Sequence, residues 1–568
     1  MSEKILSRLI VLLVLAATVY RLFPIVLGQP WLSEFFITED GYLMLTIARN
    51  MAIGLGMTVS EGTIPTNGVQ PMATFLFAVP YWLTGGDKVT SLIGVIAISA
   101  AIALAAFFAV RALARDMLRD QDDNPLWPWL AAALWFTGPL LLLHTMNGLE
   151  TGLYTLMAVL TFLRFHAVLE KGSSAVPMDR LVLGFLCGLT FLSRNDGAFL
   201  VTALFFVWML HGLFVTRAGV LGVAMQLIPP GILSLVVAAP WLINNKINFG
   251  SFVPISGSAQ AFGSEFGQNA ALVPVKLFEY IFPMLPIPAS VETWPSVIAV
   301  TAVVVAVILA VFLLGVFLRG GPVSFVVAAY VIYGLMLCGY YGLFFGAPHF
   351  MSRYLAPLAP LMIVAAVSVL VTLTRIFEAR RGAAVMAGAG VLGLALSAAL
   401  LVRLLLPGVH VHEHFQVVRY VQQNVPEEAW VGAPQTGTLG YWHDRTINLD
   451  GKVNPDALNT LLTEGHILNY VVASEITYLA DWVGLAGWMQ RPEANFAQLF
   501  ELVVEDPAAN LAVLRRRADA PAPQAPESAP QPESGAAAPA VETGAAPEAE
   551  APAGVDDIAP GDYVPPDN

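Results

Sequence analysis

Long apolar segments recur along most of the chain, and they restrict its possible folds more than any other feature. Each approaches or exceeds the roughly 17 residues that a helix needs to cross a bilayer. They fall near residues 9–28, 70–85, 89–110, 126–143, 150–168, 181–194, 196–214, 219–243, 293–318, 322–345, 354–374 and 383–406. Charged residues make up 12% of the 568 residues, whereas roughly 25% is usual in globular proteins. The chain is therefore predicted to be a polytopic α-helical membrane protein.

Basic residues between these segments predict which loops face the cytoplasm, because positive charge is retained on that side. They are Lys4, Arg8, Arg111, Arg115, Arg119, Lys171, Arg180, Arg217, Arg319, Arg375, Arg380 and Arg381. The assignment is consistent if segment 70–85, which is short and holds two prolines, re-enters or lies at the interface instead of crossing. It then predicts eleven spans, of which the first is uncleaved and starts in the cytoplasm. Loops 29–87 and 244–292, and everything after residue 407, are expected outside.

Composition divides the chain into three parts. Residues 1–407 carry the apolar segments, and residues 408–517 alternate short β patterns with helical ones, which predicts a compact α/β domain. Residues 518–568 are rich in Pro, Ala and Glu and hold ten acidic and no basic residues, so we expect a disordered tail. Nothing in the sequence indicates nucleic-acid binding, which needs a basic face. Cys187 and Cys338 lie within apolar segments, which argues against a disulfide framework.

Two adjacent carboxylates, Glu39 and Asp40, follow the first apolar segment, where a helix leaves the membrane. Ionisable groups at this depth are costly and are candidates for function. A carboxylate pair can act as a general base or hold a divalent cation. Glu150 and Asp196 could add oxygen ligands if the fold brings the four acids together. The alternative is a solvated pair that ends a transmembrane helix.

Further polar motifs fall in loops that the predicted orientation places on the same side. They contain Arg49, Asn147 with Glu150, Arg194 with Asp196, Asn245, and His349 with Arg353. Arginine binds phosphate through planar, bidentate donors, so the arginines are candidate anion ligands. Each could instead be an interfacial anchor that reaches toward the membrane surface. Glu150 and Asp196 could simply stabilise the helix N-termini where they stand.

Taken in order, these motifs resemble those of GT-C fold glycosyltransferases, the polytopic class that uses lipid-phosphate-linked sugars. The pattern is most similar to a bacterial branch that includes the mycobacterial terminal arabinofuranosyltransferases, and it covers roughly residues 1–510. The matching segments are 39–42, 47–52, 54–56, 147–151, 193–197, 249–254 and 353–357, with 436–442 and 446–454 in the C-terminal domain.

Three positions depart from the pattern of this family. Glu39 stands where the family has Asp, and residues 67–71 read Asn-Gly-Val-Gln-Pro where Thr-Asn-Pro is usual. Residues 255–258, Ile-Ser-Gly-Ser, replace a customary Asn and a downstream Lys. The last two differences bear on the identity of the donor or acceptor.

The resemblance implies transfer of a sugar, with inversion, from a polyprenyl-phosphate donor to an extracytoplasmic glycan, lipid or protein acceptor. It implies a multi-pass protein of the bacterial inner membrane, with the active site and the C-terminal domain in the periplasm. The catalytic acids would be Glu39 and Asp40. The donor phosphate would be bound by Arg353, His349 and Arg194. The expected substrate-binding residues are Arg49, Asn147, Glu150, Asp196, Asn245, Tyr441 and Trp442, the last two as rings for sugar stacking. No cofactor is firmly implied, and a divalent cation held by Glu39 and Asp40 stays open.

Two other classes of protein share part of this pattern. A secondary transporter would have similar helices and loops, but its ionisable groups would lie near the middle of the membrane. A non-catalytic membrane subunit of cell-envelope polysaccharide export would keep the fold and tolerate the loss of Glu39. The charges here gather in the loops of one side, and a globular domain follows the last span, which favours the enzyme.

Overall fold

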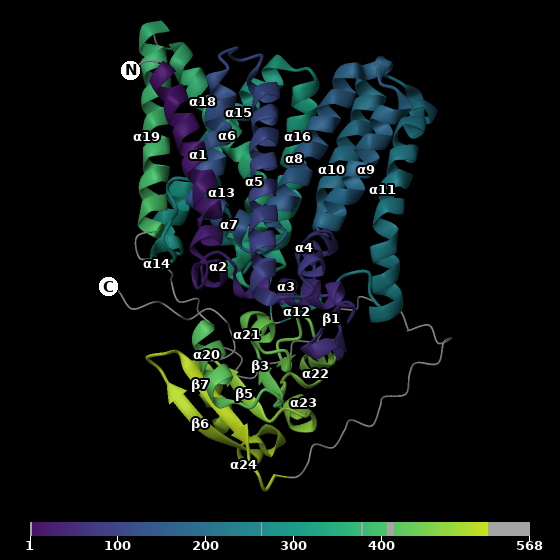
Figure 1. Ribbon diagram of the computed structural model, residues 1–568. Coiled ribbons are helices and arrows are strands. Elements are labelled where there is room, and N and C mark those ends of the chain that lie inside the picture. The colour runs from purple at the N-terminus through teal and green to yellow at the C-terminus, as the bar shows by residue number, and fades with distance from the viewer. Residues whose placement is uncertain (1–2, 263, 377–378, 406–413, 521–568) are drawn as a thin grey trace.

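The computed structural model describes residues 3–262, 264–376, 379–405 and 414–520. A bundle of long helices carries a smaller domain at one end, and the N-terminal end of the chain lies at the opposite end of the bundle (Figure 1). The predicted disordered tail lies, from residue 521 onward, outside the described residues.

Nine helical segments of the described chain are long and apolar enough to cross a membrane. They are α1 (Glu3–Leu27), α5 (Lys88–Leu118), α8 (Thr151–Lys171), α10 (Gly197–Leu210) with its continuation to Val215, α11 (Gly219–Phe249), α15 (Pro295–Arg319), α16 (Pro322–Leu343), the segment Pro348–Ile376 with α17 (Met351–Leu355) and α18 (Ala359–Ile376), and Arg381–Arg403 within α19 (Ala379–Leu405). A bent pair, α6 (Leu126–Thr137) and α7 (Pro139–Met146), makes ten if it forms one span.

The 17-residue helix α9 (Pro177–Ser193) lies beside α10 and α11 (Figure 1). Each of the eleven predicted spans therefore has a helical counterpart, and the predicted polytopic helical class is confirmed. Helices satisfy their own backbone polar groups, which is what a membrane interior requires. The outer face of α15 agrees with lipid contact, because large apolar side chains such as Val300, Val307 and Leu314 are exposed on it.

Short elements close the end of the bundle that carries the domain. They are α2 (Trp31–Glu34), α3 (Glu39–Ala52), the hairpin of β1 (Thr58–Val59) and β2 (Ile64–Pro65), α4 (Pro71–Thr84), α12 (Ile255–Ala261), α13 (Val273–Ile281) and α14 (Ala289–Glu292). The 14 residues of α4 are too few to cross a bilayer. Gly85 caps the C-terminus of α4, and its φ of +66° is a left-handed conformation that glycine adopts without strain. Segment 70–85 is not among the candidate spans, which agrees with the predicted re-entrant or interfacial position.

The C-terminal domain is a five-stranded sheet with helices around it. Its elements are α20 (Phe415–Asn424), β3 (Val431–Ala433), α21 (Gly437–Trp442), β4 (Thr446–Asn448), α22 (Pro455–Glu464), α23 (Leu468–Ala473), β5 (Tyr478–Asp481), α24 (Phe496–Leu499), β6 (Phe500–Asp506) and β7 (Leu511–Arg516). The strand order is β4-β3-β5-β7-β6. β3 is parallel to β4 and β5, whereas β7 is antiparallel to β5 and β6. This mixed sheet confirms the predicted α/β class, and its helix α21 packs directly against α3 (Figure 1).

Candidate active site

The first turn of α3 is held firmly in place. The main-chain N–H and the hydroxyl of Thr38 donate to the carbonyl oxygen of Asn147, at 3.2 and 3.3 Å. Gly41 packs so closely on this carbonyl that an added Cβ would lie 2.1 Å from its oxygen. The side chain of Asn147 accepts a bond from the N–H of Leu149 within its own turn. Asn147 thereby positions the two carboxylates that open α3.

Asp40 faces two cations. Its Oδ2 lies 2.9 Å from Nη1 of Arg353, and its Oδ1 lies 3.9 Å from Nζ of Lys452. Burial by itself raises the pKa of Asp40, but the positive charges of Lys452 and Arg353 outweigh it and hold this pKa below its usual value. Asp40 is therefore ionised at neutral pH, although partial burial alone would favour the opposite shift.

The guanidinium of Arg353 packs against two aromatic rings next to Asp40. This group lies 4.5 Å from the ring centre of Phe350 and 5.0 Å from that of Tyr354, and its Nη2 donates to the hydroxyl of Tyr354 at 3.2 Å. Its Nε is buried and has no hydrogen-bond partner among the described residues. An arginine with an unused donor at the end of the bundle is suited to bind an anion.

Glu39 points away from Asp40 and into the C-terminal domain. Its carboxylate accepts hydrogen bonds from the main-chain N–H groups of Gly437 and Thr438 and from the hydroxyl of Thr438. Position 437 must be glycine, because an added Cβ would lie 1.8 Å from the carbonyl oxygen of Glu39. Both oxygens of Glu39 thus accept hydrogen bonds at the start of α21. The two predicted acids therefore differ in role: Glu39 contacts the domain, whereas Asp40 contacts the two cations.

The structure does not assemble the acids into a metal site. Among the described residues, no group of three or more His, Cys, Asp or Glu side chains is arranged to hold a metal ion. Glu39 and Asp40 have separate partners, and Glu150 and Asp196 belong to a second cluster.

That second cluster is centred on Arg194, between α9 and α10. Arg194 lies 3.0 Å from Asp196 and 3.5 Å from Glu150, and it donates to the hydroxyl of Tyr341 at 2.8 Å. The side chains of Arg194, Glu150 and Asp196 are all buried. Arg194 therefore already has two anionic partners, which makes it a weaker candidate for the donor phosphate than Arg353.

Tyr354 connects the two clusters. Its ring stacks on Tyr341 at 4.6 Å and lies 4.4 Å from the guanidinium of Arg194, while its hydroxyl accepts from Arg353. Asp40, Arg353, Tyr354 and Arg194 thus form a continuous row of contacts, in that order. The buried Arg194 cluster fixes the ring against which Arg353 rests.

Three residues predicted to bind substrate lie in the interface between the bundle and the domain. Arg49, at the other end of α3 from Asp40, lies 3.2 Å from Asp444. Tyr441 is 1% exposed and bonds to the hydroxyl of Tyr81, so it has no open ring face for a sugar. Trp442 is half-buried beside Tyr42. These residues hold the domain in place. The sequence could not predict this role, because it depends on contacts between segments that are far apart in the chain.

The last two predicted residues differ in their accessibility. Asn245 is buried, and its Nδ2 donates to the carbonyl of Phe252 at 3.3 Å, which holds the loop after α11. His349 is exposed, with its ring 4.0 Å from the ring of Phe350. It lies in the 3₁₀ turn Pro348–Phe350, which runs directly into α17, the helix that carries Arg353. His349 therefore lies next to Phe350, at the edge of the site.

Lys452 is a site residue that the sequence motifs did not single out. It follows Gly451 in the segment 446–454, which resembles the family, but nothing local places it beside Asp40. The one feature of the sequence that could have identified Lys452 is that it is the lysine of a turn matching the family pattern. Its partner Asp40 is too distant in sequence for the contact to be predicted.

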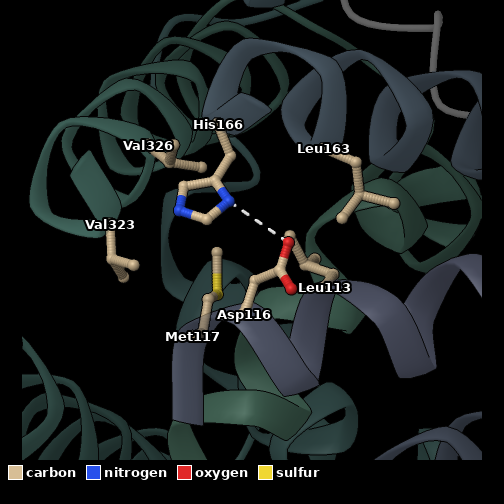
Figure 2. Close-up of a pocket in the computed structure, with 7 residues that line it drawn as sticks. All are labelled: Leu113, Asp116, Met117, Leu163, His166, Val323 and Val326. Atoms are coloured by element: carbon tan, nitrogen blue, oxygen red, sulfur yellow. Dashed lines mark hydrogen bonds and ion pairs between the residues drawn. The ribbon is translucent and has the colours of Figure 1, made fainter. Parts of the chain in front are cut away.

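A small cavity lies away from this site. It measures about 10 Å³ and is lined by side chains of α5, α8 and α16, among them His166 and Asp116, whose Nδ1 and Oδ2 atoms are 3.2 Å apart (Figure 2). Asp116 stands at the end of α5 opposite the C-terminal domain (Figure 1). This space is about that of one water molecule, too small for a substrate.

Comparison with known proteins places the geometry in a known fold. A family model described as a domain of unknown function (DUF8728) matches residues 407–519. No curated protein matches the chain by sequence. The structure is similar to ArnT from Cupriavidus metallidurans bound to undecaprenyl phosphate, with a TM-score of 0.54 and 12% identity over 90% of this chain and 98% of ArnT.

Two archaeal structures give similar TM-scores. AglB from Archaeoglobus fulgidus, in complex with an inhibitory peptide and a dolichol-phosphate, gives a TM-score of 0.53 at 13% identity over 91% of this chain and 75% of AglB. The oligosaccharyltransferase from the same organism in complex with Zn and sulfate gives 0.53 at 13% identity, over 85% of this chain and 69% of that one. At these identities the likeness establishes the architecture: the chain has the GT-C membrane fold.

Proposed function

We propose that this protein is a membrane glycosyltransferase that moves a sugar from a polyprenyl-phosphate donor to an acceptor hydroxyl. The observation that carries the proposal is the contact of Asp40 with Arg353, 2.9 Å, at the end of a GT-C bundle. It joins a carboxylate that is ionised at neutral pH to a cation with an unused donor. Two proteins of the same fold are crystallised with undecaprenyl phosphate and with dolichol-phosphate.

In the proposed reaction, Asp40 removes the proton of the acceptor hydroxyl as that oxygen attacks the anomeric carbon. The bond between this carbon and the phosphate oxygen breaks, and the phosphate leaves with the electron pair. Arg353 stabilises the charge that develops on the phosphate. A single displacement of this kind inverts the configuration at the anomeric carbon. Binding of the donor phosphate by Arg353 would also loosen the hold of this cation on Asp40, which strengthens Asp40 as a base.

The finer assignments follow the sequence motifs. The basic loops support a periplasmic position for the sheet domain and Asp40, in a bacterial inner membrane. The motif order supports the branch that includes the mycobacterial terminal arabinofuranosyltransferases, with a glycan, lipid or protein outside the cytoplasm as acceptor.

The proposal is tested by steady-state turnover of the purified full-length protein with polyprenyl-phosphate sugars. Asp40→Asn removes the base, and we expect kcat to fall by about 10²- to 10⁴-fold. Arg353→Lys keeps the charge but loses the planar fork and should be impaired, and Arg353→Ala should be impaired further. A matched control is Arg445→Ala, which removes an exposed interface arginine that pairs with Glu61. Near-normal turnover in both Asp40→Asn and Arg353→Ala would contradict the proposal.

A further inference from the structure

The C-terminal domain brings a cation into the site at the end of the bundle. Nζ of Lys452 lies 3.1 Å from Oδ2 of Asp450, 3.9 Å from Oδ1 of Asp40 and 5.6 Å from the ring centre of Phe350. The Lys452 side chain is 15% exposed. Burial lowers the pKa of Lys452, but the charges of Asp450 and Asp40 outweigh this effect and raise it, so Lys452 is charged at neutral pH.

The position of Lys452 is fixed by its own backbone. Its N–H donates to Oδ1 of Asp450 at 2.9 Å, and Gly451 before it has a φ of +77°, which closes the turn. Gly68 packs against its carbonyl so tightly that a Cβ at position 68 would lie 2.1 Å from that oxygen. The turn is therefore held against the loop that precedes α4, and the lysine side chain is directed to Asp40.

Several independent contacts keep the domain in this place. Glu39 binds the start of α21. Asp444 pairs with both Arg49 and Lys88, at 3.2 and 3.1 Å. The hydroxyl of Ser60 donates to the carbonyl of Thr446 at 2.6 Å. These contacts, on both sides of the turn, hold the segment that carries Lys452 against the end of the bundle.

We propose that Lys452 is a second cationic ligand of the donor phosphate, so that the C-terminal domain forms one wall of the active site. This inference rests on the proposed function. Arg353 and Lys452 contact Asp40 through different oxygens and share the ring of Phe350, so an anion beside Asp40 would meet both cations.

The charges of the reaction support two cations instead of one. The phosphate of a sugar donor is a diester with one negative charge, and after the sugar leaves it is a monoester with nearly two. Asp40 loses its negative charge in the same step, because it takes the acceptor's proton. The attraction that Arg353 and Lys452 exert on Asp40 is thereby transferred to the departing phosphate, and each charge on the monoester has a cation beside it.

The experiment measures binding of undecaprenyl phosphate by the full-length protein in nanodiscs, with undecaprenol as the uncharged probe. Loss of one charge-assisted contact should weaken binding of the phosphate roughly ten-fold in Lys452→Met, and binding of undecaprenol should not change. Lys452→Gln gives a second neutral replacement if the methionine variant does not fold. Lys452→Arg should restore most of the affinity.

Lys88→Met is the matched control, because Lys88 is also a half-buried lysine at the interface but pairs with Asp444. Its affinity should stay within about two-fold of that of the wild type, because Arg49 still pairs with Asp444 and holds the domain. If neutral variants of Lys452 bind as well as the wild type while Arg353→Ala does not, Lys452 is not a ligand and the proposed function stands. If the wild type does not prefer the phosphate over undecaprenol, both proposals are overturned.

Discussion

Asp40 and Glu39 are neighbours in sequence, yet their side chains leave the first turn of α3 toward different partners. Asp40 meets Arg353 and Lys452, and Glu39 meets the N–H groups at the start of α21. Residues one apart on a helix point about 100° away from each other, because a turn takes 3.6 residues. One residue therefore faces the proposed chemistry, while the other anchors the domain that supplies the second cation.

The pH dependence of kcat/KM should report the cations around Asp40. Asp40 must be ionised to act as a base, and Lys452 and Arg353 lower its pKa. Removing one positive charge in Lys452→Met raises the pKa of Asp40, so activity should begin to fall at a higher pH on the acid side of the profile. Lys452→Arg should leave the acid limb where it is in the wild type. An acid limb that does not move in Lys452→Met would show that Lys452 does not control the charge of Asp40.

At the scale of elements, the contact between α3 and α21 determines whether the site is complete. The two helices meet at Gly437, where no side chain can be accommodated. An ion pair between Asp444 and the cations Arg49 and Lys88 supports the same contact at its other side. The position of Lys452 therefore depends on a helix to which it does not belong.

A pair of alanine substitutions in α21 tests this dependence. In Gly437→Ala the new Cβ would lie 1.8 Å from the carbonyl oxygen of Glu39, so we expect the domain to separate from α3 and turnover to be lost. In Gly440→Ala the nearest atom, Cβ of Thr446, would be at 3.7 Å, an ordinary contact, and activity should be retained. Limited proteolysis of the full-length protein would follow the separation. Equal protease resistance and turnover in the two variants would count against the docking role of α21.

At the scale of the whole molecule, the two ends of the helical bundle differ in what they carry. The sheet domain and the start of α3 share one end of the bundle, while Arg319 and Arg375 stand at ends of α15 and α18 on the other (Figure 1). Basic residues are retained in the cytoplasm, so this arrangement supports an external active site.

The orientation is tested with an alkaline phosphatase fused after Arg517, because this enzyme is active only when it is exported. We expect high phosphatase activity there and low activity in a fusion after Arg217, which follows α10 at the predicted cytoplasmic end. A reporter that functions only in the cytoplasm should give the opposite result at both positions. Strong activity of that reporter after Arg517 would reverse the orientation, and with it the side on which Asp40 acts.

The sequence by itself determined the membrane class, the positions of the spans and the presence of a small α/β domain. These properties depend on composition within windows of about 20 residues, which can be read without spatial contacts. The motifs also identified Asp40 and Arg353 separately, because ionisable residues beside apolar segments are conspicuous. Segment 70–85 was predicted not to cross because it is short and holds two prolines, and because the order of the basic loops requires it.

Only the tertiary structure decided which of these residues meet. It paired Asp40 with Arg353, enclosed Arg194 between Glu150 and Asp196, buried Tyr441 against Tyr81, and added Lys452 from the far end of the chain. Each of these contacts depends on the packing of segments that are far apart in sequence. At Gly437 this packing is so close that there is no room for a Cβ. Hydropathy is a property of one segment, whereas the partner of a charged side chain is a property of two surfaces, and it exists only once they are packed together.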